Sequence, residues 1–225
     1  MRSIQLAKAK SYAWKDPKGI TNAALVILAI DLLWVVLGLS IQLVWGRRPT
    51  FQNMPPAEWA APQWVEWTHA IFGLVTLSAG VVLIFWILRA SKNAHVLKRR
   101  PLTNSPIFAA LWWYVIPFMS LFMPLESMGE IWDASAIDAG RRKQHRAILM
   151  VWWIATLLAG ALGFLVSLLR QQPIVMGLQS VTSIVQCLAF AYIVRQISSM
   201  QVESHQAWVF SDAEPTLSVL ERVTG

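Results

Sequence analysis

Two polar residues lie deep within otherwise apolar stretches of the sequence. Asp31 is near the middle of the run Ile20–Trp45, and Gln186 is at a similar depth in the run Ile174–Val194. An ionisable side chain inside a membrane is costly, so Asp31 is a candidate functional residue. Two interpretations stay open. A protonated Asp31 that hydrogen-bonds Gln186 would hold two helices together, whereas an ionised Asp31 would belong to a proton or cation pathway.

The histidines and the single cysteine are the other residues able to ligate or react. A bis-histidine haem needs two imidazoles that face each other inside a helical bundle. His95 and His145 flank basic clusters, so solvated histidines at the membrane interface are the ordinary interpretation, and His69 and His205 lack a comparable partner. The lone Cys187 excludes a disulfide framework and a multi-thiolate metal site. Since no known catalytic motif is present either, we predict no catalytic residue, metal or cofactor.

The composition places these residues in a membrane protein. Apolar residues make up 56% of the 225, charged residues only 14%, and thirteen residues are Trp; the mean hydropathy is +0.50. A soluble domain has about 25% charged residues, so a water-soluble globule and a disordered chain are both excluded. The net charge of +7 comes from basic residues at the ends of apolar runs, which favours an anionic membrane surface over nucleic acid.

Four charge-poor runs are long enough to cross a bilayer, which takes about 20 helical residues. Helix is the only open choice, because an unpaired strand would leave backbone groups unsatisfied in lipid. The first run exceeds the apolar core of a signal peptide, so we predict it to be retained. We therefore expect an all-α integral membrane protein with four transmembrane helices, at about 20–45, 67–88, 147–169 and 174–194. We also expect Trp belts at the interfaces, with Trp67 at the outer one and Trp86, Trp152 and Trp153 at the inner one.

A fifth apolar stretch, at 106–124 and its flanks, is interrupted by proline. Its longest proline-free piece, Ile107–Ile116, covers roughly half of the hydrocarbon core. It is either a kinked fifth span or a re-entrant element. The re-entrant layout with a cytoplasmic N-terminus puts every Lys and Arg except Arg47, Arg48 and Arg170 on the cytoplasmic side. The positive-inside rule therefore favours four spans plus a re-entrant element.

Three further segments flank or follow these spans. Residues 1–19 form a basic cytoplasmic tail that we expect on anionic headgroups, residues 20–197 form the membrane domain, and residues 198–225 form a polar, loosely ordered tail.

Residues 125–139 are predicted to form an interfacial helix whose carboxylates Glu126, Glu130 and Asp133 share one face. That face is either solvated or meets a cation. We hypothesise that Arg89 pairs with Glu130, or failing that Glu126, and pins the broken element to the second span.

Small residues recur every four positions along the third predicted span. Such a stripe lets helices approach closely, either inside the bundle or against another protein. Its members are Ala155, Ala159, Gly163 and Ser167.

A set of spaced residues between Phe85 and Ser135 resembles an uncharacterised bacterial membrane domain family, known as a domain of unknown function. The chain departs from the family pattern at Ser120, where the pattern has Asn. The resemblance implies a multi-span protein of the bacterial inner membrane and supplies no reaction, ligand or partner. The residues that carry it are Trp86, Arg89, Asn93, Ser105, Pro106, Pro117, Pro124, Ile131, Trp132 and Ser135.

Two classes of function remain compatible with these features. A non-enzymatic accessory or scaffolding subunit of a membrane complex needs only packing surfaces and an interfacial acidic face. A small oligomeric transporter or channel would use Asp31 and the broken element as polar midplane and cavity lining. We predict the accessory role. The expected partners are a bilayer with anionic lipids on its cytoplasmic side and either a membrane protein or a second copy of the chain.

Overall fold

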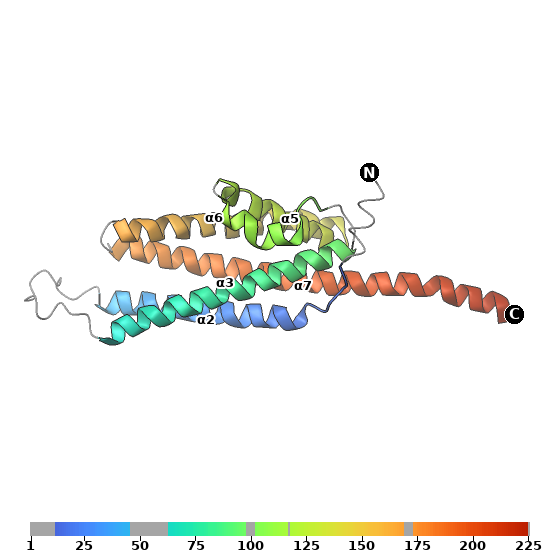
Figure 1. The fold of residues 1–225 in the computed structure, drawn as a ribbon, viewed down its shortest axis with the longest axis horizontal. Coiled ribbons are helices and arrows are strands. Elements are labelled where there is room, and N and C mark those ends of the chain that lie inside the picture. Colours follow the sequence, from blue (N-terminus) through green and yellow to red (C-terminus); the bar gives the residue numbers. More distant parts are fainter. Residues whose placement is uncertain (1–11, 46–62, 98–101, 117, 169–172, 225) are drawn as a thin grey trace, which may run out of the picture. The chain divides into compact units, whose positions relative to one another are not determined.

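The computed structural model describes residues 12–45, 63–97, 102–116, 118–168 and 173–224, and these residues contain helices and no strand. Figure 1 shows the arrangement. The long helices are α2 (Lys18–Trp45), α3 (Gln63–Leu97), α5 (Met123–Ser135), α6 (Ala139–Leu168) and α7 (Pro173–Thr224). Three short elements precede α5: the π-helix η3 (Phe108–Trp112), α4 (Trp113–Val115) and the 3-10 helix η4 (Met119–Leu121).

Among the described residues, four helices are long and apolar enough to cross a membrane, which confirms the predicted number of spans. They are Lys18–Ser40, Gly73–Leu97, Arg146–Val166 and Ile174–Val209. The second and fourth spans end later in the sequence than predicted, because a helix need not end where charged residues begin. Arg89 and Lys92 continue α3, and Arg195 continues α7. The chain has the build of a multi-pass membrane protein.

The region beyond Ser198 differs from the loosely ordered tail that the sequence suggested. α7 continues as one helix to Thr224. Ser198, Gln201 and Ser204 follow each other at intervals of three along it, and all three are buried. Residues at this spacing share one face of a helix. Their polarity therefore reflects a buried polar contact and not a solvated tail.

The chain divides into two compact units, and α2, α3, α6 and α7 each contribute to both. Unit 2 comprises residues 23–83 and 150–191. Its interior is narrow and includes Leu28, Ala79 and the ring pair Trp152–Phe190, whose centroids are 5.0 Å apart. Large apolar side chains such as Leu77 and Phe164 are exposed, as expected for helices that face lipid.

The small-residue stripe of α6 approaches α7 closely at Gly163. Ala155 is buried, and a Cβ added to Gly163 would lie 3.1 Å from Nε2 of Gln179 in α7. Ala159 is half-buried, and the side chain of Ser167 lies outside the described part. The close approach at Gly163 favours packing inside the bundle as the use of this stripe.

Unit 1 comprises residues 1–22, 84–149 and 192–225. Its core is denser, since Trp86, Met128, Ile193, Ile197 and Met200 are all buried almost completely. Trp86 of this unit, and Trp152 and Trp153 of unit 2, which were predicted for an inner Trp belt, are each at most 5% exposed. These rings pack inside the protein, whereas Trp67 is exposed.

The proline-broken element reverses direction within unit 1. Ile116 is extended (φ −74°, ψ 120°), as expected for the residue before a proline, and Phe118 has a positive φ of 63°. The chain then passes through η4 into α5, where Pro124 occupies the first turn, its favoured place in a helix. η3 and α4 lie against α5. The chain turns back here, which is the path predicted for a re-entrant element.

Candidate functional site

The most distinctive feature of unit 1 is a cluster of buried polar side chains, which we call the polar clasp. A buried polar group without a hydrogen-bond partner costs about 1–3 kcal/mol, so a cluster of them has to be internally paired. The clasp consists of Thr21 from α2, Trp86 and Asn93 from α3, Ser135 from α5, and Ser198, Gln201 and Ser204 from α7.

Asn93 is at the centre of the clasp and is fully buried. Its Nδ2 donates to the backbone oxygen of Lys15 at 2.9 Å and to Oε1 of Gln201 at 3.3 Å. Its Oδ1 accepts from the backbone N–H of Lys15 at 3.4 Å. Only a carboxamide offers both donors and an acceptor in this geometry. Asn93 therefore binds the main chain of the N-terminal segment at two points.

Gln201 connects α7 to α3 and α5. Its Nε2 donates to the backbone oxygen of Ala90 at 2.8 Å and to Oγ of Ser135 at 3.1 Å. Ser135 donates in turn to the backbone oxygen of Ile131 at 2.7 Å, and Ser204 donates to the backbone oxygen of Ser135 at 2.7 Å. These bonds satisfy the carbonyl of Ser135 at the end of α5, which would otherwise lack a helical partner.

Ser198 closes the clasp on the side of α2. The hydroxyls of Thr21 and Ser198 are 2.7 Å apart, and Nε1 of Trp86 donates to Ser198 Oγ at 3.3 Å. An indole has only this one donor, so a buried Trp is best placed where the donor is used. Three helices, α2, α3 and α7, meet at this hydroxyl.

The N-terminal segment 12–17 is held to α3 and α7 by ring contacts as well. The ring of Tyr12 meets His95 edge-on at 5.5 Å, and the ring of Trp14 stacks on His205 at 4.2 Å. Pro17 is buried almost completely. Residues 12–17 of the predicted cytoplasmic tail are thus packed on the protein, because their backbone and rings find partners there; residues 1–11 lie outside the described part.

Most of the described residues that carry the family resemblance are buried in unit 1. Trp86 and Asn93 belong to the clasp, and Ile131, Trp132 and Ser135 are at most 4% exposed. Pro106 and Pro124 are buried where the broken element starts and where α5 starts, while Ser105 is exposed and Arg89 is half-buried. Pro117 lies outside the described residues. The sequence motif thus mostly records one packed core.

Glu130 ties the start of the broken element to α5. Its Oε2 accepts from the backbone N–H of Asn104 at 3.2 Å and from Nδ2 of Asn104 at 3.1 Å. Its Oε1 accepts from the hydroxyl of Thr103 and from the backbone N–H of Thr103 at 3.4 Å. Hydrogen bonds to an ionised acceptor are stronger than neutral ones, so this carboxylate fixes the chain immediately before Ser105 and Pro106.

This arrangement differs from the predicted pairing of Glu130 or Glu126 with Arg89. In the part of the chain that the structure describes, neither carboxylate forms an ion pair with Arg89. The acceptor sites of Glu130 are occupied by Thr103 and Asn104, and Glu126 is exposed. Arg89 is half-buried in α3. This burial fits an arginine whose aliphatic stem lies along apolar surface.

We expect Glu130→Ala to lower the free energy of unfolding by about 1–3 kcal/mol, because it removes the carboxylate that accepts hydrogen bonds from Thr103 and Asn104. Glu126→Ala is the matched control on the same helix and should change stability by less than about 0.5 kcal/mol. Thermal unfolding in mild detergent measures both. Equal losses of stability in Glu130→Ala and Glu126→Ala would contradict the role given to Glu130. If Arg89→Glu lowered the stability and adding Glu130→Arg restored it, the result would instead support an ion pair between the two residues.

Asp31 lies half-buried in unit 2, where the side chain that hydrogen-bonds its carboxyl group is Thr76 of α3. The partner predicted from the sequence was Gln186 of α7, which is half-buried beside Cys187. Cys187 donates to the backbone oxygen of Leu28 at 3.3 Å, which places α7 against α2 one turn from Asp31. Thr76 was missed because a single Thr in an apolar helix is not distinctive in sequence.

The described residues contain no group of three His, Cys, Asp or Glu side chains that could hold a metal ion. His95 and His205 lie against Tyr12 and Trp14, and the side chains of His69 and His145 lie outside the described part. What the site does chemically is therefore to bind a peptide backbone and to join helices through amide and hydroxyl groups.

Comparison with known proteins identifies the family but no characterised relative. No curated protein and no solved structure matches the chain. A family model described as a domain of unknown function, DUF4328, matches residues 51–201. The match contains Trp86, Asn93, Ser135, Ser198 and Gln201 of the clasp, and it confirms the resemblance to an uncharacterised domain seen in the sequence. Because the match covers most of its length, the chain belongs to the DUF4328 family.

Proposed function

We propose that the chain is a non-enzymatic accessory or scaffolding subunit of a membrane protein complex in the bacterial inner membrane, with its N-terminus in the cytoplasm. The proposal is supported by the clasp, in which the amides of Asn93 and Gln201 are used in internal hydrogen bonds. Buried, paired polar groups make a rigid core. They do not form a nucleophile, base and oxyanion constellation of the kind that catalysis needs.

The observation that carries the proposal is the C-terminal arm, which we define as residues Gln206–Thr224 of α7. Figure 1 shows this part of the helix extending past the ends of α3 and α5. Trp208 and Val209 at its beginning are 53% and 46% exposed. Helices in proteins owe most of their stability to packing on other elements, and exposed aromatic residues are typical anchors of protein interfaces. The arm therefore fits a binding element for another protein.

The test is purification in mild detergent of the full chain and of a chain that ends at His205. The shortened chain keeps Ser204 and His205, so the clasp and the contact with Trp14 are retained. We expect a protein in stoichiometric amount to accompany the full chain and to be lost from the shortened chain and from Trp208→Ser. Tyr192→Ser is the matched control, because Tyr192 is an exposed aromatic residue of the same helix outside the arm. A pure, partner-free protein in every case would contradict the proposal.

A second function, a small oligomeric transporter or channel for an ion or small solute, is favoured by the contacts of Asp31. The carboxyl group and the hydroxyl of Thr76 provide a polar pair between α2 and α3 in otherwise apolar helices. Intramembrane carboxylates of this kind serve as proton or cation sites in transporters.

We expect Asp31→Asn to separate the two functions. In a scaffold the amide can keep the hydrogen bond to Thr76, so the melting temperature in detergent should stay within a few degrees of the wild type and proteoliposomes should show no flux difference. In a transporter the same variant should abolish proton or cation flux, measured with an entrapped pH-sensitive or ion-sensitive dye, while the protein stays folded. Thr76→Val is the control that removes the hydrogen bond and keeps the carboxyl group.

A further inference from the structure

The turn of the broken element carries the most exposed apolar side chains of unit 1. We call the segment Val115–Phe122 the tip. Phe118 is 82% exposed, Phe122 is 70% exposed and Val115 is 61% exposed. Exposed aromatic and aliphatic residues gathered on one turn mark a contact surface rather than ordinary surface composition. The chemistry around the tip decides what it contacts.

Four backbone N–H groups of the tip are hydrogen-bonded to nearby backbone carbonyls. The N–H of Ser120 donates to the carbonyl of Ile116 at 3.0 Å, the N–H of Leu121 to Phe118 at 3.1 Å, and the N–H of Phe122 to Met119 at 3.1 Å. The N–H of Ile116 is bonded to Trp112 at 3.1 Å. Internal pairing of this kind is what lets backbone enter hydrocarbon, where water is absent. A turn that faced water would not need it.

The reversal also places a bulky ring where glycine is the usual residue. Phe118 has φ 63°, a region that large side chains rarely adopt. Strained backbone of this kind tends to persist where it serves a function. Here the strain coincides with the most exposed ring of the tip.

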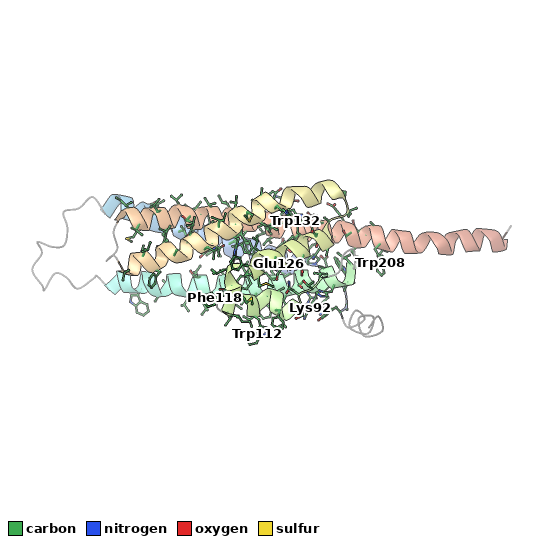
Figure 2. The ribbon with its side chains drawn as sticks, turned by 90° about the horizontal axis from the view of Figure 1, so that it is seen from above. Lys92, Trp112, Phe118, Glu126, Trp132 and Trp208 are labelled. Atoms are coloured by element: carbon green, nitrogen blue, oxygen red, sulfur yellow. The ribbon has the colours of Figure 1, made fainter. Side chains whose placement is uncertain are left out.

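The charge around the tip points to lipid. No acidic, basic or histidine residue occurs from Pro101 to Leu125. In Figure 2, Phe118 and Lys92 lie on opposite sides of Glu126 along the horizontal axis. The tip thus points away from the charged end of α3. Phe85 of α3 is a 57% exposed residue of the candidate span Gly73–Leu97.

We infer that the tip inserts into the acyl-chain region of one bilayer leaflet, the leaflet that adjoins the charged end of unit 1. Its partner is the hydrocarbon of phospholipids, which Phe118, Phe122 and Val115 contact directly. A groove on another protein and a second copy of the chain are the occupants that the test has to exclude. This inference goes beyond the proposed function and does not depend on the C-terminal arm.

The test uses a spin label on single cysteines in a Cys187→Ser background, with the full chain in vesicles of zwitterionic and anionic phospholipids. Labels at Phe118→Cys, Phe122→Cys and Val115→Cys report on the tip. Phe85→Cys is the standard for lipid exposure. Lys15→Cys is the standard for water, because the native side chain is exposed and the bond to Asn93 involves only the backbone. Collisions with oxygen, which concentrates in hydrocarbon, are compared with collisions with a water-soluble nickel chelate.

We expect the ratio of oxygen to nickel collisions at the tip to equal that at Phe85 and to exceed that at Lys15 several-fold. A ratio like that of Lys15 would overturn the inference, because the tip would then be in water. Low collision rates with both reagents would also overturn it, because protein would then cover the tip. Should Phe118→Cys fail to fold, the labels at Phe122 and Val115 decide, since neither residue has a positive φ.

Discussion

Replacing Asn93 with alanine is expected to lower the free energy of unfolding by about 2–4 kcal/mol, since it leaves the amide of Lys15 and the side chain of Gln201 without their buried partner. The N-terminal segment should be released at the same time, because Asn93 holds its backbone at two points. Trypsin should then cut after Lys15 and Lys18 faster than in the wild type. Thermal unfolding in detergent and the rate of this cleavage measure the two effects.

Asn22→Ala is the matched control for this variant, because Asn22 is an exposed Asn in the same unit. It should change stability by less than about 0.5 kcal/mol. Asn93→Asp keeps the acceptor for the N–H of Lys15 and removes the two Nδ2 donor bonds, so it should also be destabilising. Wild-type stability in Asn93→Ala would show that the clasp does not support the fold.

Replacing Trp86 with alanine is expected to cost about 3–5 kcal/mol, the usual loss for a large aromatic ring removed from a core. The ring is only 1% exposed and lies where α2, α3 and α7 meet. Much of the protein should therefore fail to survive extraction in detergent. The fraction that elutes as a monodisperse peak in size-exclusion chromatography measures the loss.

Trp86→Phe separates the packing of this ring from its hydrogen bond. It keeps an aromatic ring and removes Nε1, so it should retain more folded protein than Trp86→Ala and less than the wild type. Adding Ser198→Ala to Trp86→Phe tests the partner of this hydrogen bond. If Nε1 is bonded to Ser198 Oγ, the second change should lower the amount of folded protein only by the effect of losing the bond to Thr21. A Trp86→Ala protein as stable as the wild type would contradict the assignment of Trp86 to the core.

The spans were predictable because crossing a bilayer sets a requirement on consecutive residues of the sequence. A helix that crosses hydrocarbon needs an uninterrupted apolar run, and any run that meets this need can be recognised without knowledge of its neighbours. The reversal between Ile116 and Phe122 was indicated for a similar reason, since Pro117 and Pro124 limit where a helix can continue. Both features depend only on residues close together in the chain.

The clasp could not be predicted, because its partners are far apart in the sequence. Gln201 bonds to Ala90, and Lys15 bonds to Asn93. In neither pair does the sequence around one residue indicate its partner. Glu130 shows the same problem on a smaller scale. Its charge suggested Arg89 as a partner, whereas the structure satisfies it with neutral donors of Thr103 and Asn104. The interval of three between Ser198, Gln201 and Ser204 was the one available sign of a buried polar face.

The bond between Thr21 and Ser198 has a consequence for how the protein is made, because 177 positions separate the two residues. A chain that emerges from the ribosome from its N-terminus exposes Thr21, Trp86 and Asn93 long before Ser198 and Gln201 exist. The N-terminal segment has to wait for α7, so unit 1 can close only after the last helix has been synthesised. A nascent chain arrested before α7 would present unpaired amides and hydroxyls, a feature by which quality-control proteases could distinguish unfinished copies from finished ones.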